Sequence, residues 1–210
     1  MMRLYEFGPT RSLRVRWTLQ ELGVPFQSVI VDMSRNEHQL PDFLSLNPAA
    51  KLPVLVDGDL VLNESAAIVL YLAEKYADKG LVPKDLRERA DMTRWLLFTV
   101  TELEQPLWRI ARNTFVYAES DRVAADVPVA RRDFEAMAAV MDAHMRDREF
   151  VVGNHVTVAD FVLAYTLDWA NEEELLAKFP RLKAYMEKLY RRPTATPRIA
   201  AAMAAVQAAG

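Results

Sequence analysis

The chain has no cysteine among its 210 residues. Disulfides, thiolate metal sites, iron–sulfur clusters and a cysteine nucleophile are therefore excluded. The three histidines, His38, His144 and His155, are too far apart in the sequence to show a metal-ligand spacing. We therefore expect no metal site, and a reactive sulfur would have to come from a bound molecule.

The chain also lacks a concentrated run of basic residues. It carries 26 lysines and arginines against 29 aspartates and glutamates, a formal net charge of −3. We therefore expect neither nucleic acid nor an anionic membrane surface as a partner. No uncharged apolar run approaches the roughly 18 residues that span a bilayer, and the N-terminus has no apolar core of a signal peptide. These absences predict a cytoplasmic protein.

Hydrophobic residues make up 51% of the chain, enough for the core of one large or two small domains. The first 77 residues alternate strand and helix patterns. We predict strands at 4–7, 28–31, 51–56 and 60–62, the last two as a hairpin around Asp57-Gly58. Between them we predict a helix ending near Gly23, a short irregular helix within 32–46, and a helix beginning near Ser65. This order, βαβ, a helical excursion and ββα, predicts an α/β domain.

From residue 87 onward, helical spacing replaces the strand patterns. We predict helices at 87–117, with a kink at Pro106, then at 131–148, 157–169 and 172–191, and within the alanine-rich tail 195–210. The predicted organisation is an α/β domain at 1–77, a linker at 78–86 and an all-α domain at 87–210.

Three motifs carry a resemblance to a known family. Residues 47–55 read NPAAKLPVL, residues 63–68 read NESAAI, and residues 153–160 read GNHVTVAD. In this order and spacing, they resemble the cytosolic glutathione S-transferases over nearly the whole chain. The resemblance implies a thioredoxin-like N-terminal domain that binds glutathione. It also implies a helical C-terminal domain that supplies a pocket for an electrophile.

The resemblance assigns two segments to the middle and one end of glutathione. It implies a cis bond before Pro53, which would turn the backbone of Leu52 outward to pair with the cysteinyl backbone. Ser65 begins a helix whose free N–H groups and positive dipole end suit the γ-glutamyl carboxylate. The carboxylate of Glu64 would pair with the ammonium group of the γ-glutamyl residue. A plain N-cap is the alternative role for Ser65, and one hydroxyl can serve both.

Two basic side chains are candidates for the glycine carboxylate at the other end of the tripeptide. Lys51 directly precedes Leu52. His38 precedes the NPAAKLP motif by a spacing that matches the histidine of some subclasses of the family. The alternative for His38 is a solvated loop position.

The thiol of glutathione needs a hydrogen-bond donor, because a thiol with a pKa of roughly 8.5 is mostly protonated at pH 7 and the thiolate is the nucleophile. The resemblance places the donor between the first strand and the first helix. Ser12 and Thr10 compete for this role, and Tyr5 ranks third. Each of the two loop hydroxyls could instead be a plain N-cap. Arg11 would add positive charge near the sulfur or point to water.

The helical domain is implied to bind the electrophile. Trp108, Arg109 and Arg112 lie beyond the predicted kink and are, with Arg11, our candidates for this pocket. Aromatic residues at helical spacing more often belong to a core.

Thr157 and Asp160 have the spacing of a capping box. We predict that this pair is structural rather than catalytic.

The expected function is therefore that of a glutathione transferase, a homodimeric detoxification enzyme that conjugates glutathione to hydrophobic electrophiles. Glutathione is a co-substrate, and no metal takes part. Two alternatives remain open: a glutathione-dependent peroxidase or disulfide reductase, and a non-catalytic binder of glutathione or apolar ligands.

Overall fold

The structure is a computed structural model and describes residues 1–209. Contacts divide the chain into two compact units. Unit 1 holds residues 1–82 and the C-terminal segment from Tyr190 onward, and unit 2 holds residues 83–189. The predicted fold class is confirmed, because unit 1 contains a four-stranded mixed sheet with helices and unit 2 is helical. The boundaries differ from those of the sequence interpretation, which places the tail in the helical domain.

The sheet of unit 1 has the strand order β2-β1-β3-β4. Its strands are β1 (Met2–Glu6), β2 (Phe26–Ile30), β3 (Val54–Asp57) and β4 (Leu60–Asn63). β1 runs parallel to β2 and antiparallel to β3, and β3 and β4 form the predicted hairpin. Gly58 in the hairpin turn has a φ of 64°, a left-handed conformation that glycine adopts without steric cost.

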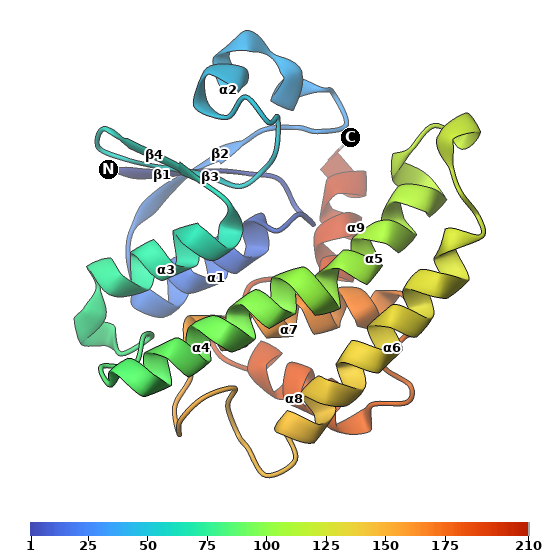
Figure 1. The fold of residues 1–210 in the computed structure, drawn as a ribbon. Helices are drawn as coiled ribbons and strands as arrows, with labels where there is room; N and C mark the ends of the chain where they lie inside the picture. The colour runs from blue at the N-terminus through green and yellow to red at the C-terminus, as the bar shows by residue number, and fades with distance from the viewer. Residues whose placement is uncertain (210) are drawn as a thin grey trace. The chain divides into compact units, whose positions relative to one another are not determined.

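Helices cover both faces of this sheet (Figure 1). α1 (Ser12–Leu22) and α3 (Ser65–Lys75) pack together on one face, and the short α2 (Pro41–Leu46) lies over the other. Single 3-10 turns, Glu37–Gln39 and Ala77–Lys79, follow β2 and α3. α1 ends at Gly23, whose φ is 67°, as its position after the last apolar residue predicts.

The C-terminal segment belongs to unit 1 because side chains tie it to α1. Glu21 of α1 accepts hydrogen bonds from Arg192 and Thr194, and the rings of Trp17 and Tyr190 lie 4.8 Å apart. The segment ends in α9 (Ile199–Ala209). A Cβ atom built on Gly8 would lie 3.3 Å from the Cβ of Ala202 in this helix, so α9 packs directly against the loop that follows β1.

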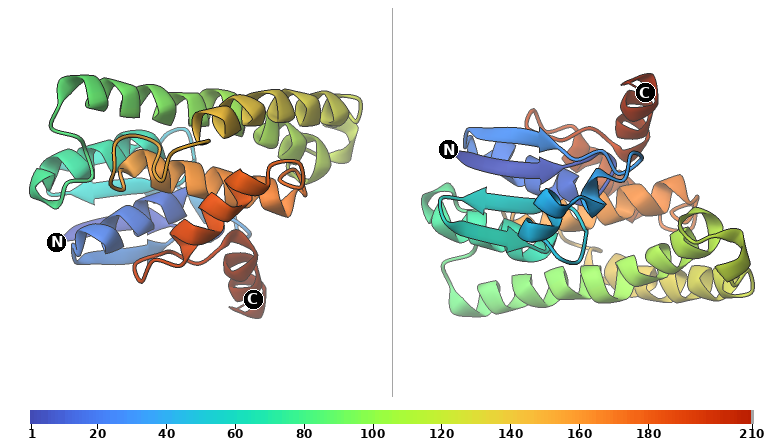
Figure 2. Two further views of the ribbon diagram at one scale, coloured as in Figure 1. Left: turned by 90° about the horizontal axis from the view of Figure 1, so that it is seen from below. Right: turned by 90° about the horizontal axis from the view of Figure 1, so that it is seen from above.

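Unit 2 is built from α4 (Leu86–Phe98), α5 (Glu104–Ala111), α6 (Asp126–His144), α7 (Val158–Glu172) and α8 (Pro180–Tyr190). α5 and α6 pack side by side (Figure 2), and nearly every residue of α7 is buried. A π-helical turn, Thr99–Leu103, joins α4 to α5, and a second one, Arg112–Val116, follows α5. A 3-10 turn, Glu119–Asp121, precedes α6. Pro106 follows the first π turn closely, and since proline has no N–H to donate, a widened turn accommodates the lost hydrogen bond.

Of the helices in residues 1–209, none is both long enough and apolar enough to cross a membrane.

Candidate functional site

Two hydroxyl groups meet in the loop between β1 and α1. The Oγ atoms of Thr10 and Ser12 lie 2.7 Å apart. The hydroxyl of Thr10 also donates to the carbonyl oxygen of Phe7 at 2.5 Å. The Ser12 side chain is fully buried, whereas Thr10 is partly exposed. Two of the three predicted candidates for thiol activation therefore belong to one hydrogen-bonded cluster.

The direction of the hydrogen bonds in this cluster follows from counting protons. A hydroxyl has one proton to donate, and the proton of Thr10 goes to the carbonyl of Phe7, which can only accept. The proton between the two hydroxyls must then come from Ser12. The backbone N–H of Ser12 also points to Thr10 Oγ1, at 3.3 Å. Thr10 is therefore the acceptor for Ser12 and the outer member of the chain of hydroxyls.

The loop before β3 is organised by Asn47, a buried residue of the NPAAKLP motif. Its side-chain amide donates to the carbonyl of Lys51 at 2.7 Å, and its side-chain oxygen accepts from the backbone N–H of Ala49 at 3.1 Å. Ala50 has a φ of 54°. The bond between Leu52 and Pro53 is cis, as the resemblance predicts. A second cis bond, between Gly8 and Pro9, was not predicted.

The start of α3 holds a third hydroxyl. Ser65, its first residue, is only 5% exposed. Glu64 occupies the N-cap with a φ of 68° and an exposed side chain, and no side chain caps the helix. The guanidinium of Arg14, from α1, donates from Nη1 to Ser65 Oγ at 3.3 Å. α3 therefore begins with a buried hydroxyl that accepts a hydrogen bond from a cation.

Arg14 was missed in the sequence analysis as a possible site residue. Its side chain is 1% exposed, although arginine is rarely buried so completely. No local sequence signal identifies it, because its burial depends on α3 packing beside α1.

Two basic residues predicted to bind a carboxylate lie in the same unit. His38 sits in the 3-10 turn after β2, half-buried, and its Nδ1 is buried without a hydrogen-bond partner among the described residues. Lys51 is exposed, and its backbone is held by Asn47. An unsatisfied buried ring nitrogen calls for a ligand or water as its partner, so His38 has the stronger structural reason to bind.

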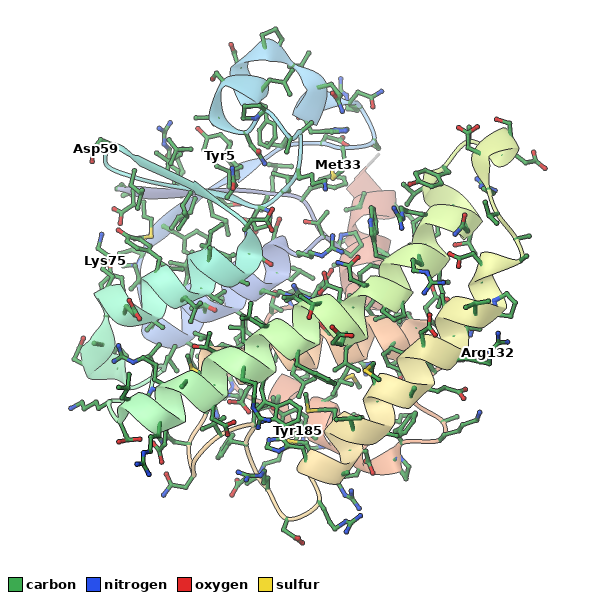
Figure 3. The ribbon with its side chains drawn as sticks, in the orientation of Figure 1. Tyr5, Met33, Asp59, Lys75, Arg132 and Tyr185 are labelled. Atoms are coloured by element: carbon green, nitrogen blue, oxygen red, sulfur yellow. The ribbon has the colours of Figure 1, made fainter. Side chains whose placement is uncertain are left out.

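Tyr5 points away from the hydroxyl cluster. Side chains alternate along a strand, and Glu6 points toward α1, where it pairs with Arg16. Tyr5 therefore faces the opposite side, under α2, where its ring lies 6.4 Å from that of Phe43 (Figure 3). This placement separates Tyr5 from Thr10 and Ser12.

In unit 2, Arg109 has charged partners of its own. Its guanidinium binds Asp126 and Asp133 of α6. These hydrogen bonds raise its pKa, with Asp126 as the main cause, and Arg109 in turn lowers the pKa of Asp126. This arrangement favours a structural role in holding α5 against α6.

Arg112 and Trp108 of unit 2 each contact an aromatic ring. Arg112 Nη1 donates to the hydroxyl of Tyr117 at 3.1 Å, and the guanidinium lies 5.6 Å from the centre of the same ring. Trp108 is partly exposed and meets Trp169 edge to face at 6.4 Å. Arg11 occupies the N-cap of α1 through its backbone, and its side chain is half-buried.

Two helices of unit 2 begin with complete side-chain caps. The Asp85 carboxylate accepts the backbone N–H groups of Arg87 and Glu88 at 2.9 and 3.0 Å at the start of α4. Thr157 and Asp160 form the predicted capping box of α7. α1, by contrast, has no side-chain cap at its N-cap residue, and neither does α3.

Asp160 is the centre of the cap of α7. Its carboxylate accepts from the backbone N–H groups of Thr157 and Val151 at 2.7 and 2.8 Å, and from the hydroxyl of Tyr185 at 2.6 Å. Burial raises the pKa of Asp160. Asp160 and its donors all lie inside the helical unit. This placement favours a structural role for Thr157 and Asp160.

No group of three or more histidine, cysteine, aspartate or glutamate side chains gathers as a metal site within residues 1–209.

Comparisons with known proteins agree with this arrangement. Residues 1–74 match the family described as glutathione S-transferase, N-terminal domain, and residues 102–193 match glutathione S-transferase, C-terminal domain. The chain is 38% identical over 154 residues to glutathione S-transferase F10 of Arabidopsis thaliana, covering 71% of each chain. It is 34% identical over 202 residues to glutathione S-transferase 3 of Zea mays, covering 90% of this chain and 88% of that one.

Solved structures give the same result. A glutathione S-transferase from Xylella fastidiosa has a TM-score of 0.82 at 27% identity and covers 99% of this chain and 98% of its own. A theta class glutathione S-transferase from Xanthomonas axonopodis pv. citri, solved with glutathione bound, has a TM-score of 0.80 at 27% identity and covers 94% and 96%. With both halves matched and the strand order and helices in agreement, the chain belongs to the glutathione S-transferase family.

Proposed function

We propose that the protein is a glutathione transferase that binds glutathione in unit 1, stabilises its thiol as the thiolate and conjugates it to hydrophobic electrophiles. The observation that carries this proposal is the hydrogen-bonded pair Thr10–Ser12 at the start of α1, in the unit that matches the family's N-terminal domain. A chain without cysteine can use the sulfur of a bound tripeptide as its nucleophile.

Glutathione has two carboxylates and a peptide backbone, and unit 1 offers a partner for each. The backbone of Leu52 beside Pro53 would pair with the cysteinyl residue. Ser65 at the start of α3 would bind the γ-glutamyl carboxylate, and Glu64 the ammonium group. His38, with its unsatisfied Nδ1, and Lys51 would bind the glycine carboxylate.

We assign the contact with sulfur to Thr10 and a supporting role to Ser12. Thr10 is the partly exposed member of the pair, while Ser12 is fully buried and directs its proton toward Thr10. When sulfur is bound, the Thr10 hydroxyl would turn from the carbonyl of Phe7 to the sulfur. That carbonyl keeps the backbone N–H of Thr10 as a partner, at 3.0 Å, so the turn leaves no buried acceptor unsatisfied.

The energy required is within reach of this arrangement. Lowering a thiol pKa from roughly 8.5 by two units needs about 2.7 kcal/mol of preferential stabilisation of the thiolate. A hydrogen bond to a charged acceptor contributes about 1.5–3 kcal/mol, and the N-terminus of α1 adds about 0.3–1 kcal/mol. The thiol proton leaves to solvent, and the thiolate sulfur forms a bond to the electrophilic carbon while the leaving group departs with its electron pair.

For the electrophile we propose Trp108 and Arg112 of unit 2. Partial exposure of Trp108 and the cation–aromatic pair of Arg112 with Tyr117 support these residues. We leave Arg109 out because its charge is already bound by two carboxylates, and Tyr5 because it faces α2.

We further propose a cytoplasmic homodimer that acts in detoxification. Exposed apolar side chains support an interface between copies: Leu60 and Val61 on the edge strand β4, and Leu97 on α4, are between 37% and 50% exposed. Sedimentation equilibrium of the purified protein tests this assembly, and a monomer at micromolar concentration would contradict it.

Turnover measurements with two substrates test the function. The purified protein with glutathione is given a chlorinated aromatic electrophile, and separately an organic hydroperoxide. Chloride release is the expected result. Hydroperoxide reduction alone would indicate a peroxidase, and tight glutathione binding with no turnover of either substrate would indicate a binder.

A further inference from the structure

One face of the sheet in unit 1 is covered less completely than the other. α1 and α3, of eleven residues each, pack on one face, whereas α2 over the other face has six residues and is only about 9 Å long. A cavity of about 220 Å³ lies where α2 meets the sheet, and we call it the α2 cavity. Its apolar lining consists of Val31, Leu40, Leu46 and the rings of Phe43 and Tyr5, the last of which is labelled in Figure 3.

The α2 cavity is open to solvent although its lining is apolar. Val31 and Phe43 belong to a buried cluster, but Leu40 is 54% exposed and Tyr5 is partly exposed. Exposed apolar side chains around a hollow are typical of a ligand pocket. Pockets for drug-sized ligands usually hold about 300–1,000 Å³, so this smaller one suits a single ring with a short arm.

Two carboxylates, those of Glu37 and Asp42, also line the α2 cavity. Oε2 of Glu37 accepts the backbone N–H of Asp32 at 2.8 Å, and Oε1 has no hydrogen bond within residues 1–209. In the same part of the chain, neither the Asp42 carboxylate nor the Tyr5 hydroxyl has a hydrogen-bond or ion-pair partner. The polar groups of the lining are therefore available to a donor.

These groups favour a ligand with positive charge. Carboxylates only accept hydrogen bonds, and the faces of the Tyr5 and Phe43 rings attract cations. The guanidinium of Arg3 lies 5.8 Å from the centre of the Tyr5 ring, so this ring already accommodates a cation, but Arg3 is exposed and does not line the cavity. Glutathione has two carboxylates and one ammonium group, so its net charge has the wrong sign for the α2 cavity.

We propose that the α2 cavity binds a small amphipathic organic cation, a primary ammonium group on a single aromatic or branched apolar body. The body would occupy the space lined by rings and leucines, and the ammonium group would donate to Glu37, Asp42 and the hydroxyl of Tyr5. This is a second site, apart from Thr10 and Ser12, because Tyr5 faces the opposite side of the sheet under α2. It goes beyond the proposed function and does not depend on it.

Three probes of one shape test the role of charge. 2-Phenylethylammonium, 2-phenylethanol and 3-phenylpropanoate share the ring and the arm and differ in the terminal group. Ligand-observed NMR titrations of the whole protein at neutral pH measure their Kd values. The Kd of the ammonium should be at least about tenfold lower than that of the alcohol, and the carboxylate should bind most weakly. Equal Kd values for the ammonium and the alcohol would overturn the proposal.

Variants of single acids locate the binding. Asp42→Asn removes the charge of an exposed side chain, and Glu37→Gln keeps an oxygen for the N–H of Asp32. Each should raise the Kd of the ammonium about fivefold and change that of the alcohol less than about twofold. Asp59→Asn, in the hairpin turn between β3 and β4 and outside the cavity, is the matched control and should keep the wild-type Kd. An equal effect of Asp59→Asn would indicate attraction to the net charge alone and would overturn the proposal.

A titration in the presence of glutathione separates this site from the proposed function. With millimolar reduced glutathione present, the Kd of the ammonium should change less than about twofold. Displacement of the ammonium by glutathione would place the probe in the glutathione site and overturn the proposal. A protein that binds the ammonium, responds to Asp42→Asn and does not bind glutathione would support the α2 cavity and refute the proposed function.

Discussion

Hydroxyl side chains stand at helix starts in both units of the molecule, but they are used differently. In unit 2, Thr157 is bound within its own helix start, where the Asp160 carboxylate accepts from its backbone N–H at 2.7 Å and its hydroxyl at 2.9 Å. In unit 1, Ser12 and Ser65 are the first residues of α1 and α3, and the N-cap residues before them, Arg11 and Glu64, make no side-chain capping hydrogen bond. Ser12 instead bonds to Thr10, and Ser65 to Arg14.

This difference assigns the start of α7 to stability and the starts of α1 and α3 to ligand binding. A helix start closed by its own side chains satisfies the free N–H groups within the fold. A helix start without such a cap keeps its positive dipole end for a ligand. At α1 the N–H groups of Ser12 and Leu13 bond to Thr10, so the hydroxyl groups are the donors that remain there. We therefore expect changes at the start of α7 to affect folding, and changes at the starts of α1 and α3 to affect glutathione.

The largest effect should follow from Asp160→Ala. It removes the common acceptor of Val151, Thr157 and Tyr185 and leaves buried donors unsatisfied, at about 3 kcal/mol or more of unfolding free energy. Urea unfolding measures the loss. The Kd of glutathione for the folded protein should stay within about twofold, and a large change in that Kd at unchanged stability would contradict the comparison.

A smaller effect, on catalysis, should follow from Thr10→Ala. A hydrogen bond to the thiolate contributes about 2 kcal/mol, and its loss should lower kcat/KM about thirtyfold. Steady-state conjugation kinetics measure the change, with Thr10→Ser as the control that keeps the hydroxyl. Ser12→Ala should have a weaker effect in the same direction. A Thr10→Ala enzyme with wild-type kcat/KM would exclude Thr10 as the sulfur contact.

Thr157→Ala should destabilise the protein by about 1 kcal/mol, the usual cost of an N-cap hydroxyl. Differential scanning calorimetry would detect this as a lower Tm. Because Asp160 keeps its hydrogen bonds from Val151 and Tyr185, the loss should be clearly smaller than that of Asp160→Ala. Conjugation by the folded variant should match that of the wild type, and a selective loss of turnover would contradict a structural role.

The smallest effect should come from His144 at acidic pH. Its Nε2 bonds to the carbonyl of Val151 at 2.8 Å, its ring stacks on Trp95 at 3.9 Å, and burial lowers its pKa below the usual 6.5. The unfolded chain then binds the proton more readily, so the contribution of His144 is present above pH 6.5 and is lost as pH falls through the lowered pKa. Urea midpoints across this range should fall with acidification, and His144→Gln should flatten the slope; an identical slope in that variant would contradict this assignment.

Local chemistry made several elements of both units predictable. The pair Asp57-Gly58 suits a hairpin turn, Gly23 suits a helix end, and the capping box of Thr157 and Asp160 was readable from spacing alone. The thiol and carboxylate candidates came from motif resemblance. The sequence made Thr10 and Ser12 competitors for one role, whereas the structure joins them by a hydrogen bond.

Contacts between distant parts of the chain were not predictable. The pairing of Arg192 with Glu21 joins residues 171 positions apart, so the grouping of the tail with unit 1 does not follow from a local pattern. The burial of Arg14 depends on α3 packing beside α1, and no local pattern contains that information. The π-helical turn before Pro106 was also not predictable, because a proline in a helical pattern predicts an irregularity of the helix without specifying its geometry.

The most direct test of the account is the pKa of the glutathione thiol in the complex. An ultraviolet titration of thiolate absorbance, with the protein saturated by reduced glutathione, measures it. The account predicts a pKa about two units below the roughly 8.5 of a free thiol, moving back toward the free value in Thr10→Ala. A bound thiol that titrates like free glutathione, or no binding at millimolar concentration, would contradict it.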